Sequence, residues 1–253
     1  MRQLLVPFGE IVGDRLPVPA EVRHRLDRVL RLAPGTALTL ADGAGRRVQV
    51  RYHQEFFAVE RREPTQPPPA VAVTLAAGLI KGDRWDWLVE KAAELGVDTL
   101  VPLACEHSVV RIDPGKAADK QARWQSIAQE AFEQCGRAHL CRVTAPMTVA
   151  QFVERCGGEL RSQIAAFTCD EAMPALGLQR AVQQALAASQ GIRQLVAVVG
   201  PEGGLSTTEW QCLDSAGFER VCLSRAVLRA ETAGLAAALI VREALEPVLA
   251  TQE

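Results

Sequence analysis

The sequence lacks the residue groupings that mark most metal and redox sites. No two of its seven cysteines are separated by two residues, so it contains no C-x-x-C pair. Clusters of histidine or acidic residues with the spacing of metal ligands are also missing, and we expect no metal. No uncharged apolar stretch is long enough to span a membrane, and we expect neither a signal peptide nor a membrane partner. The simplest account of the cysteines is that they are free thiols in a reducing cytoplasm. Most of them are then expected to be small buried apolar residues.

Lysine is scarce, and nearly all of the basic residues are arginine. The chain holds 24 arginines and 4 lysines, and its net charge is −2. The first 69 residues hold eleven arginines, no lysine and eight acidic residues. This basic N-terminal balance favours contacts with phosphates or bases, because guanidinium binds two oxygens at once and stacks on rings. A genome rich in G and C would favour arginine everywhere, so the bias alone adds little.

A proline-rich stretch, residues 63–69, separates two patterns in the chain. Before it, the apolar segments are short and β-like, with a turn at Asp42-Gly43-Ala44-Gly45 and one expected helix over residues 20–31. We expect this part, residues 1–66, to form a small β-barrel. The strands expected here cover residues 4–6, 37–40, 47–52 and 56–60.

After the linker, expected strands and helices alternate. Repeated βα units predict a mostly parallel sheet covered on both faces by helices, so the fold class is α/β. We expect this second domain to cover residues 70–253. Its expected strands are residues 71–76, 99–104, 164–169, 195–199 and 220–223, and its expected helices are residues 83–95, 119–134, 176–188, 206–216 and 231–249.

The most informative segment connects one of these strands to the next helix, at residues 198–209. Three glycines and a proline break the apolar run, and Ser206 with Glu209 has the spacing of a capping box. The loop matches neither G-x-x-x-x-G-K-[ST] nor G-x-G-x-x-G, and Glu202 would repel a phosphate. Its open backbone suits a neutral or zwitterionic ligand such as an adenine-containing molecule, and we expect the backbone at Gly203 to approach it. A tight turn with no ligand is the alternative.

A second unusual loop follows the next expected strand, at residues 223–233. It carries Arg225 and Arg229, and Glu231 with Thr232 begins a long helix rich in Ala and Leu. Because the carboxyl ends of parallel strands lie on one edge of a sheet, we expect the two loops to meet where α/β folds bind ligands. Alternatively, the arginines are solvated surface, and Glu231 only complements the helix dipole.

Six groups of motifs, taken in order, resemble one family. GPEGG at residues 200–204 and L-x-x-x-x-L-R-x-E-T-A at residues 223–233 are the most specific of them. The others are His24 with Val29-Leu30-Arg31 and Asp42-Gly43, Lys81-Gly82-Asp83-Arg84, the segment at residues 90–97 and the segment QEAFEQCGR at residues 129–137. Together they resemble the RsmE family of 16S rRNA uracil-N3 methyltransferases, within the SPOUT superfamily.

The resemblance implies a PUA-like barrel over residues 1–66 and an α/β-knot catalytic domain over residues 70–253, with a trefoil knot. It implies S-adenosylmethionine as methyl donor, 16S rRNA within the 30S subunit as substrate, and a homodimer with the site near the subunit interface. The cofactor-binding residues that it implies are Phe167, Thr168, Val199, Gly200, Pro201, Glu202, Gly203, Gly204, Leu223, Ser224, Val227, Leu228, Arg229, Glu231, Thr232 and Ala233.

Methyl transfer to N3 of uracil requires the loss of a weakly acidic proton from that nitrogen. We assign Arg229 to stabilising the negative charge on a uracil oxygen. Glu202 and Glu231 are candidate bases, and either could instead cap or orient the backbone. We assign phosphate contacts with the RNA to Arg2, His24, Arg28, Arg31, Lys81, Arg84, Arg111 and Arg137.

Three positions depart from the family pattern. Ser224 and Ala226 replace a glycine and an arginine of the second loop, with Arg225 one position earlier, and His107 stands where the family has arginine. These departures concern the RNA contacts more than the cofactor site. They leave two alternatives to an active uracil-N3 methyltransferase. One is an RNA-binding or ribosome-assembly factor without methyl transfer, and the other is a SPOUT methyltransferase with a different RNA target.

Overall fold

The computed structural model describes residues 2–6, 8, 13–157, 162–171 and 176–249. The chain divides into two compact units. One comprises Met1–Pro68 together with Gln129–Leu140, and the other comprises Pro69–Ala128 together with Cys141–Glu253. In the described ranges, no helix combines the length and apolar character needed to cross a membrane. The same ranges contain no group of three or more His, Cys, Asp or Glu arranged to hold a metal ion.

The first unit is built on a five-stranded sheet in the order β1-β3-β4-β5-β2. β1 pairs parallel with β3, and the other neighbours are antiparallel. Inward-facing residues alternate with outward-facing ones, as at Val48, Val50 and Tyr52, which are all fully buried. The strands are β1 (Arg2–Leu5), β2 (Arg15–Pro17), β3 (Ala37–Ala41), β4 (Arg47–His53) and β5 (Phe56–Arg62).

The helix expected over residues 20–31 is not a single α-helix. α1 (Ala20–His24) continues as a π-helical turn, η1 (Arg25–Val29), and Arg31 has φ +50°. Asp27, in the π-helical turn, accepts a hydrogen bond from the Tyr52 hydroxyl. Burial and this bond raise the pKa of Tyr52 to about 12. The wider turn therefore ties the helix to the core of the sheet, a long-range contact that local periodicity does not reveal.

The segment Gln129–Leu140, which includes the end of α3 (Ala117–Cys135), belongs to the first unit although the linker precedes it by some sixty residues. Glu133 accepts two hydrogen bonds from the Arg25 guanidinium, at 2.8 and 2.6 Å, and one from the backbone N–H of Leu5 at 3.0 Å. The buried Gln3 side chain donates to the carbonyl oxygens of Phe132 and Arg137. The expected first domain, residues 1–66, did not include this segment.

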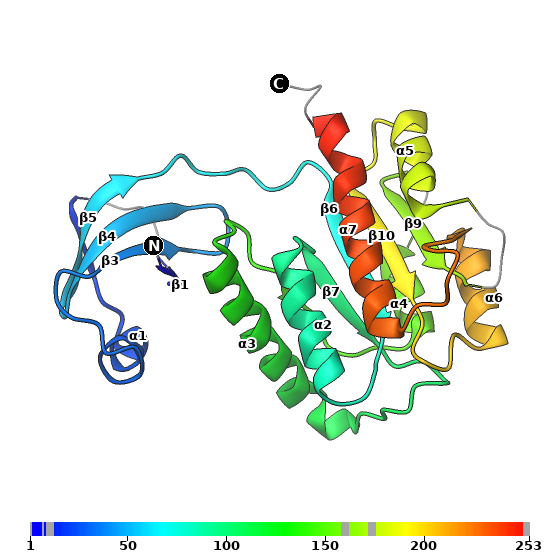
Figure 1. Ribbon diagram of the computed structural model, residues 1–253, viewed down its shortest axis with the longest axis horizontal. Helices are drawn as coiled ribbons and strands as arrows, with labels where there is room; N and C mark the ends of the chain where they lie inside the picture. The colour runs from blue at the N-terminus through cyan, green and yellow to red at the C-terminus, as the bar shows by residue number, and fades with distance from the viewer. Residues whose placement is uncertain (1, 7, 9–12, 158–161, 172–175, 250–253) are drawn as a thin grey trace. The chain divides into compact units, whose positions relative to one another are not determined.

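The second unit contains a six-stranded sheet in the order β11-β9-β10-β6-β7-β8, and every neighbouring pair is parallel (Figure 1). This confirms the α/β class and the parallel sheet. Most strands match the expected ranges to within two residues, whereas the two-residue strand β8 was not expected. The strands are β6 (Ala72–Gly78), β7 (Thr99–Leu103), β8 (Arg142–Val143), β9 (Ile164–Cys169), β10 (Gln194–Val199) and β11 (Glu219–Val221).

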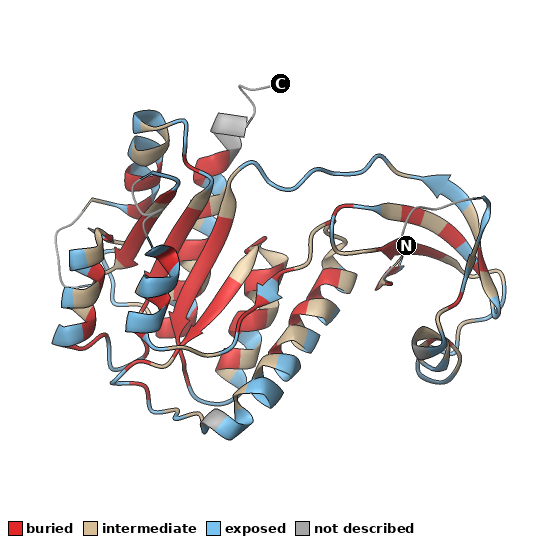
Figure 2. Cartoon of the chain, turned by 180° about the vertical axis from the view of Figure 1, so that it is seen from behind, coloured by how far each residue is buried: buried red, intermediate tan, exposed pale blue. Residues whose placement is uncertain are grey.

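Helices cover both faces of this sheet, and Figure 2 shows its strands as largely buried. On one face, α7 (Ala230–Leu249) packs against α2 (Asp83–Glu94), α5 (Leu178–Ala188), β6 and β10. A methyl group at Gly234 of α7 would lie 2.9 Å from Leu88 of α2 and 3.8 Å from Leu75 of β6, so glycine permits this close packing.

On the other face, α4 (Val149–Cys156) and α6 (Thr207–Ala216) pack against each other. Phe152 and Leu213 from these helices share a core with Ala76 and Val198 from the sheet. The sequence reading missed α4, whose start is marked by a capping box between Thr148 and Gln151. The 3-10 turn η2 (Pro114–Lys116) precedes α3.

We predict that Glu133→Ala lowers the stability of the first unit. The substitution removes four hydrogen bonds, two of them from the Arg25 guanidinium, so the free energy of unfolding should fall by about 1.5–3 kcal/mol. Urea unfolding measures the change, with Gln134→Ala, an exposed neighbour on the same helix, as the control. Equal effects of the two substitutions would show that Glu133 does not anchor the segment.

Candidate functional site

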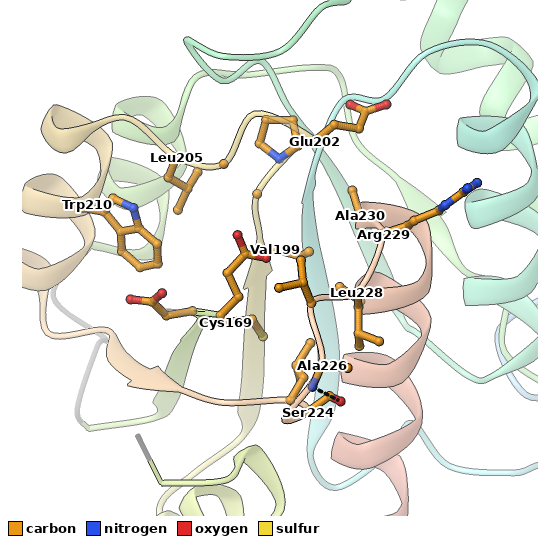
Figure 3. Close-up of a pocket in the computed structure, with 18 of the residues that line it drawn as sticks. Cys169, Val199, Glu202, Leu205, Trp210, Ser224, Ala226, Leu228, Arg229 and Ala230 are labelled. Atoms are coloured by element: carbon orange, nitrogen blue, oxygen red, sulfur yellow. Dashed lines mark hydrogen bonds between the residues drawn. The ribbon is translucent and has the colours of Figure 1, made fainter. Parts of the chain in front are cut away.

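The two unusual loops line one cavity of about 550 Å³ at the carboxyl edge of the parallel sheet (Figure 3). The loops follow β10 and β11, which lie on either side of β9. The ends of three adjacent strands therefore meet there, as expected for a ligand site in an α/β fold. The volume falls in the range of small-molecule sites, about 300–1,000 Å³.

Most of the residues expected to bind a cofactor line this cavity, although they come from two loops some twenty residues apart. The two loops converge because of the strand order, in which only β9 lies between β10 and β11. The expected residues that line the cavity are Val199, Gly200, Pro201, Glu202, Gly204, Leu223, Ser224, Val227, Leu228, Arg229 and Ala233.

Five expected residues are not among those that line it. Phe167 and Thr168 are buried within β9, one or two residues before the strand ends. Gly203 lies between the lining residues Glu202 and Gly204, Glu231 is buried at the start of α7, and Thr232 is exposed at the next position of that helix. The approach of the Gly203 backbone to a ligand stays a prediction.

Seven lining residues were missed by the sequence reading. The end of β9 supplies Cys169, its last residue, and the two residues that follow it, just beyond Phe167 and Thr168. Two further apolar side chains, which the glycine pattern did not indicate, come from Leu205 just before α6 and from Trp210 near the start of that helix. The missed residues are Cys169, Asp170, Glu171, Leu205, Trp210, Ala226 and Ala230.

Close backbone packing holds the GPEGG loop, residues 200–204. A methyl group at Gly78, the last residue of β6, would lie 2.4 Å from the backbone nitrogen of Pro201. Gly204 has φ +70°, a conformation that glycine adopts without strain. A methyl group at Gly203 would lie 2.9 Å from Cβ of His107. Three of these glycines are thus required by neighbouring protein atoms or by backbone conformation.

The loop that follows β7 braces the same segment. His107 Nδ1 donates a hydrogen bond to the carbonyl oxygen of Gly203 at 3.1 Å. Glu209 forms the expected capping box with Ser206 and also accepts a hydrogen bond from the backbone N–H of Glu106. Burial and the nearby Glu209 carboxylate raise the pKa of Cys105 to about 12, so that thiol stays protonated. The histidine that departs from the family pattern has a structural role here.

The other departure from the pattern also has a local function. Ser224 Oγ accepts a hydrogen bond from the backbone N–H of Ala226 at 3.1 Å, closing a tight turn in the second loop (Figure 3). Arg225 is exposed at the tip of this turn, and Ala226 lines the cavity. Serine therefore organises the loop in place of the family glycine, and neither departure obstructs the cavity.

Arg84, expected to bind RNA, lines the cavity and contacts both candidate bases. Its guanidinium lies 2.7 Å from Glu202 Oε1 and 3.7 Å from Glu231 Oε2. Glu231 is only 7% exposed, and its Oε2 has no hydrogen-bond partner. In Figure 3, the Arg229 side chain extends away from Trp210, on the far side of the cavity. One edge of the cavity thus carries two arginines and a carboxylate, with a buried carboxylate behind them.

The remaining residues expected to contact RNA fall in both units. Arg2, His24, Arg28 and Arg31 are exposed in the first unit, which also contains the partly buried Arg137. Lys81 and Arg111 are exposed in the second unit, and Arg111 donates to the carbonyl oxygen of Glu106. The contacts of these residues with RNA stay predictions.

Comparison with known proteins identifies the family. Residues 67–242 match the RNA methyltransferase domain family. The chain is 32% identical to ribosomal RNA small subunit methyltransferase E of Synechocystis sp. over 96% of this chain and 78% of that protein. The chain belongs to the ribosomal RNA small subunit methyltransferase E family. The RsmE resemblance seen in the sequence is thereby confirmed.

Solved structures of similar proteins agree over nearly the whole chain. Ribosomal RNA small subunit methyltransferase E from Neisseria gonorrhoeae, bound to S-adenosylmethionine, is 28% identical, with a TM-score of 0.79 and coverage of 98% of both chains. A methyltransferase from Legionella pneumophila, also solved with bound S-adenosylmethionine, is 27% identical, with a TM-score of 0.81 and coverage of 96% of this chain and 97% of that one. The fold found here is that of RsmE relatives that bind this cofactor.

We predict that Gly78→Ala displaces the GPEGG loop. The added methyl group would overlap Pro201, so the free energy of unfolding should fall by about 1–3 kcal/mol, and the cavity should lose ligand affinity. Thermal unfolding and calorimetric titration with S-adenosylmethionine measure the two effects. Gly177→Ala, where a methyl group meets no atom within 4 Å, is the control. A Gly78→Ala protein that behaves like this control would contradict the packing argument.

Proposed function

We propose that this chain transfers a methyl group from S-adenosylmethionine to N3 of a uridine in 16S rRNA of the small ribosomal subunit. The observation that carries the proposal is the single cavity lined by both family motifs, GPEGG at residues 200–204 and the loop at residues 223–233. Membership of the ribosomal RNA small subunit methyltransferase E family supports the rRNA substrate and the chemistry.

The cavity walls suit this cofactor. Val199, Leu205 and Leu228 provide apolar surface for a ring, and the backbone of the GPEGG loop provides hydrogen-bonding groups. Asp170 and Glu171 supply carboxylates, which accept hydrogen bonds from ribose hydroxyls or from an amino group. When bound, S-adenosylmethionine supplies an electrophilic methyl group on a sulfonium ion. The apolar walls therefore fit a neutral ring, and the backbone groups and carboxylates fit the ribose and the charged amino-acid chain joined to it.

Glu202 and Arg229 stand at the edge of the cavity where an acceptor base would enter. We assign Glu202 to accepting the proton from uracil N3, because it belongs to the cavity lining and its carboxylate is partly exposed at the rim. Arg229 stabilises the negative charge that develops on a uracil oxygen. Glu231 does not line the cavity, and its buried carboxylate holds the charge of Arg84 in place beside Glu202. Arg84 thus orients the base rather than contacting RNA phosphates.

We also propose the finer architecture that the resemblance implies. Residues 1–66 form a PUA-like RNA-binding barrel, and residues 70–253 form a SPOUT domain with a trefoil knot. The eleven arginines in the first 69 residues support RNA binding by the barrel. Exposed Arg2, Arg28 and Arg31 are its expected phosphate contacts.

Two exposed apolar side chains support a homodimer. Trp87 of α2 is 43% exposed and Leu239 of α7 is 45% exposed, and these helices pack against each other. Trp87 and Leu239 are the side chains that we expect the partner subunit to cover. We propose that the dimer acts on 16S rRNA within the 30S subunit, in the cytoplasm.

We predict that Glu202→Gln lowers kcat by about 10²- to 10⁴-fold, because glutamine still bonds to Arg84 but accepts no proton. The Kd for S-adenosylmethionine should change little. Single-turnover methylation and calorimetry separate the two quantities, with Glu219→Gln, an exposed position of β11, as the control. Full activity in Glu202→Gln together with loss of activity in Glu231→Gln would reverse the two assignments.

The overall proposal predicts 3-methyluridine in 16S rRNA after incubation of the protein with S-adenosylmethionine and 30S subunits that lack the modification. Mass spectrometry of the digested rRNA identifies the base and the methylated atom together. A methyl group on another base would show a different target. No methylation, with the cofactor bound, would favour an RNA-binding or assembly factor.

A further inference from the structure

Trp210 forms one wall of the cavity, and none of the family motifs includes it. It lies on α6, opposite Val199 and Leu228 (Figure 3). The indole and these branched aliphatic side chains supply apolar surface to the cavity lining, beside the carboxylates of Asp170 and Glu171. Apolar and aromatic lining of this kind is typical of sites that bind a flat ring.

A fixed cation holds this tryptophan from outside the cavity. The Arg220 guanidinium carbon lies 4.4 Å from the centre of the Trp210 ring. Arg220 also donates to both carboxylate oxygens of Asp214, at 3.0 and 2.6 Å, and lies 3.4 Å from Asp170 Oδ2. Arg220 does not line the cavity, so its contacts act through Trp210 and Asp170, which do.

These contacts join three separate elements behind the cavity wall. Arg220 comes from β11, Trp210 and Asp214 come from α6, and Asp170 follows β9. The hydrogen bonds to Asp214 raise the pKa of Arg220, and the same bonds lower the pKa of the Asp214 carboxyl. Both groups of the pair are therefore charged at neutral pH. A guanidinium held in this way restricts the rotation of the indole before any ligand binds.

The place of Trp210 in the cavity indicates which part of the cofactor it meets. Arg229 extends from the opposite side of the cavity, so the acceptor base and the reacting sulfonium belong on that side (Figure 3). Trp210 is then left to the part of the cofactor that does not react. Of the cofactor's parts, only the adenine ring offers a flat π surface for an indole.

We propose that Trp210 binds the adenine ring of S-adenosylmethionine and that Arg220 is the positioning residue that holds Trp210 and Asp170 in place. The inference rests on the proposed function for the identity of the cofactor. It adds a binding residue and a positioning residue that lie outside the GPEGG loop and the loop at residues 223–233. In this arrangement Trp210 supplies affinity for adenosine, and the loops supply the contacts to the rest of the molecule.

Calorimetric titration of the full chain with S-adenosylmethionine and, separately, with adenosine tests the inference. Trp210→Leu keeps an apolar wall but removes the π surface, and it should raise the Kd for both ligands about 10- to 100-fold. Trp210→Phe should restore most of the affinity. In the wild type, adenosine should quench tryptophan emission, and the quenching should disappear in Trp210→Phe.

Arg220 is tested with the same two ligands. Arg220→Ala should weaken both about tenfold and alter Trp210 emission, whereas Arg220→Lys, which keeps a cation near the ring, should recover part of the loss. Arg193→Ala, at an exposed position beside β10, is the matched control and should leave both Kd values unchanged. Urea unfolding shows that each variant is folded.

The outcomes separate this inference from the proposed function. A wild-type protein that binds no S-adenosylmethionine contradicts the proposed function itself. Wild-type binding with unchanged affinities in Trp210→Leu overturns the inference and leaves the function standing. Loss of S-adenosylmethionine binding with unchanged adenosine binding also overturns it, because Trp210 would then contact the methionine part.

Discussion

The close backbone packing between the end of β6 and the GPEGG loop is the constraint on which the site depends. Gly78 has no side chain, and Pro201 occupies the space where one would lie. The loop is braced from a second side by His107 and Glu209. A loop fixed in this way presents its backbone groups to the cavity before any ligand arrives, which lowers the entropy cost of binding.

Charge is distributed unevenly around the cavity. Arg84 joins Glu202 at one edge to the buried Glu231, and Arg220 joins Asp170 to the outer surface at the other side. Each arginine is paired with the carboxylate of a lining residue, which restricts that side chain before a ligand enters. Fixed charges of this kind are more effective in catalysis and in binding than side chains free to rotate in water.

The sequence predicted the organisation of the second unit well, because its strands and helices have strong local patterns. The alternation of apolar runs and amphipathic helices gave the parallel sheet, and Ser206 with Glu209 gave the start of α6. The motifs gave most of the cavity walls. Asp170 and Glu171 were missed although Phe167 and Thr168 of the strand before them were expected, because local periodicity does not give the exact residue at which a strand ends.

Long-range side-chain contacts were also beyond the sequence. Arg84 was expected to bind RNA. Its ion pairs with Glu202 and Glu231 could not be predicted, because nothing in the sequence near an arginine at a helix start indicates partners more than a hundred residues away. The segment Gln129–Leu140 was placed with the second domain, although Glu133 and other residues tie it to the first unit. Such contacts depend on the folded chain and cannot be read from spacing.

A crystal structure of the protein with S-adenosylmethionine tests the central claim most directly. The account predicts that the cofactor occupies the cavity between the GPEGG loop and residues 223–229, and contacts both. Cofactor bound at another place, or contacting only one of the two loops, would contradict the claim that these two segments form one methyl-donor site.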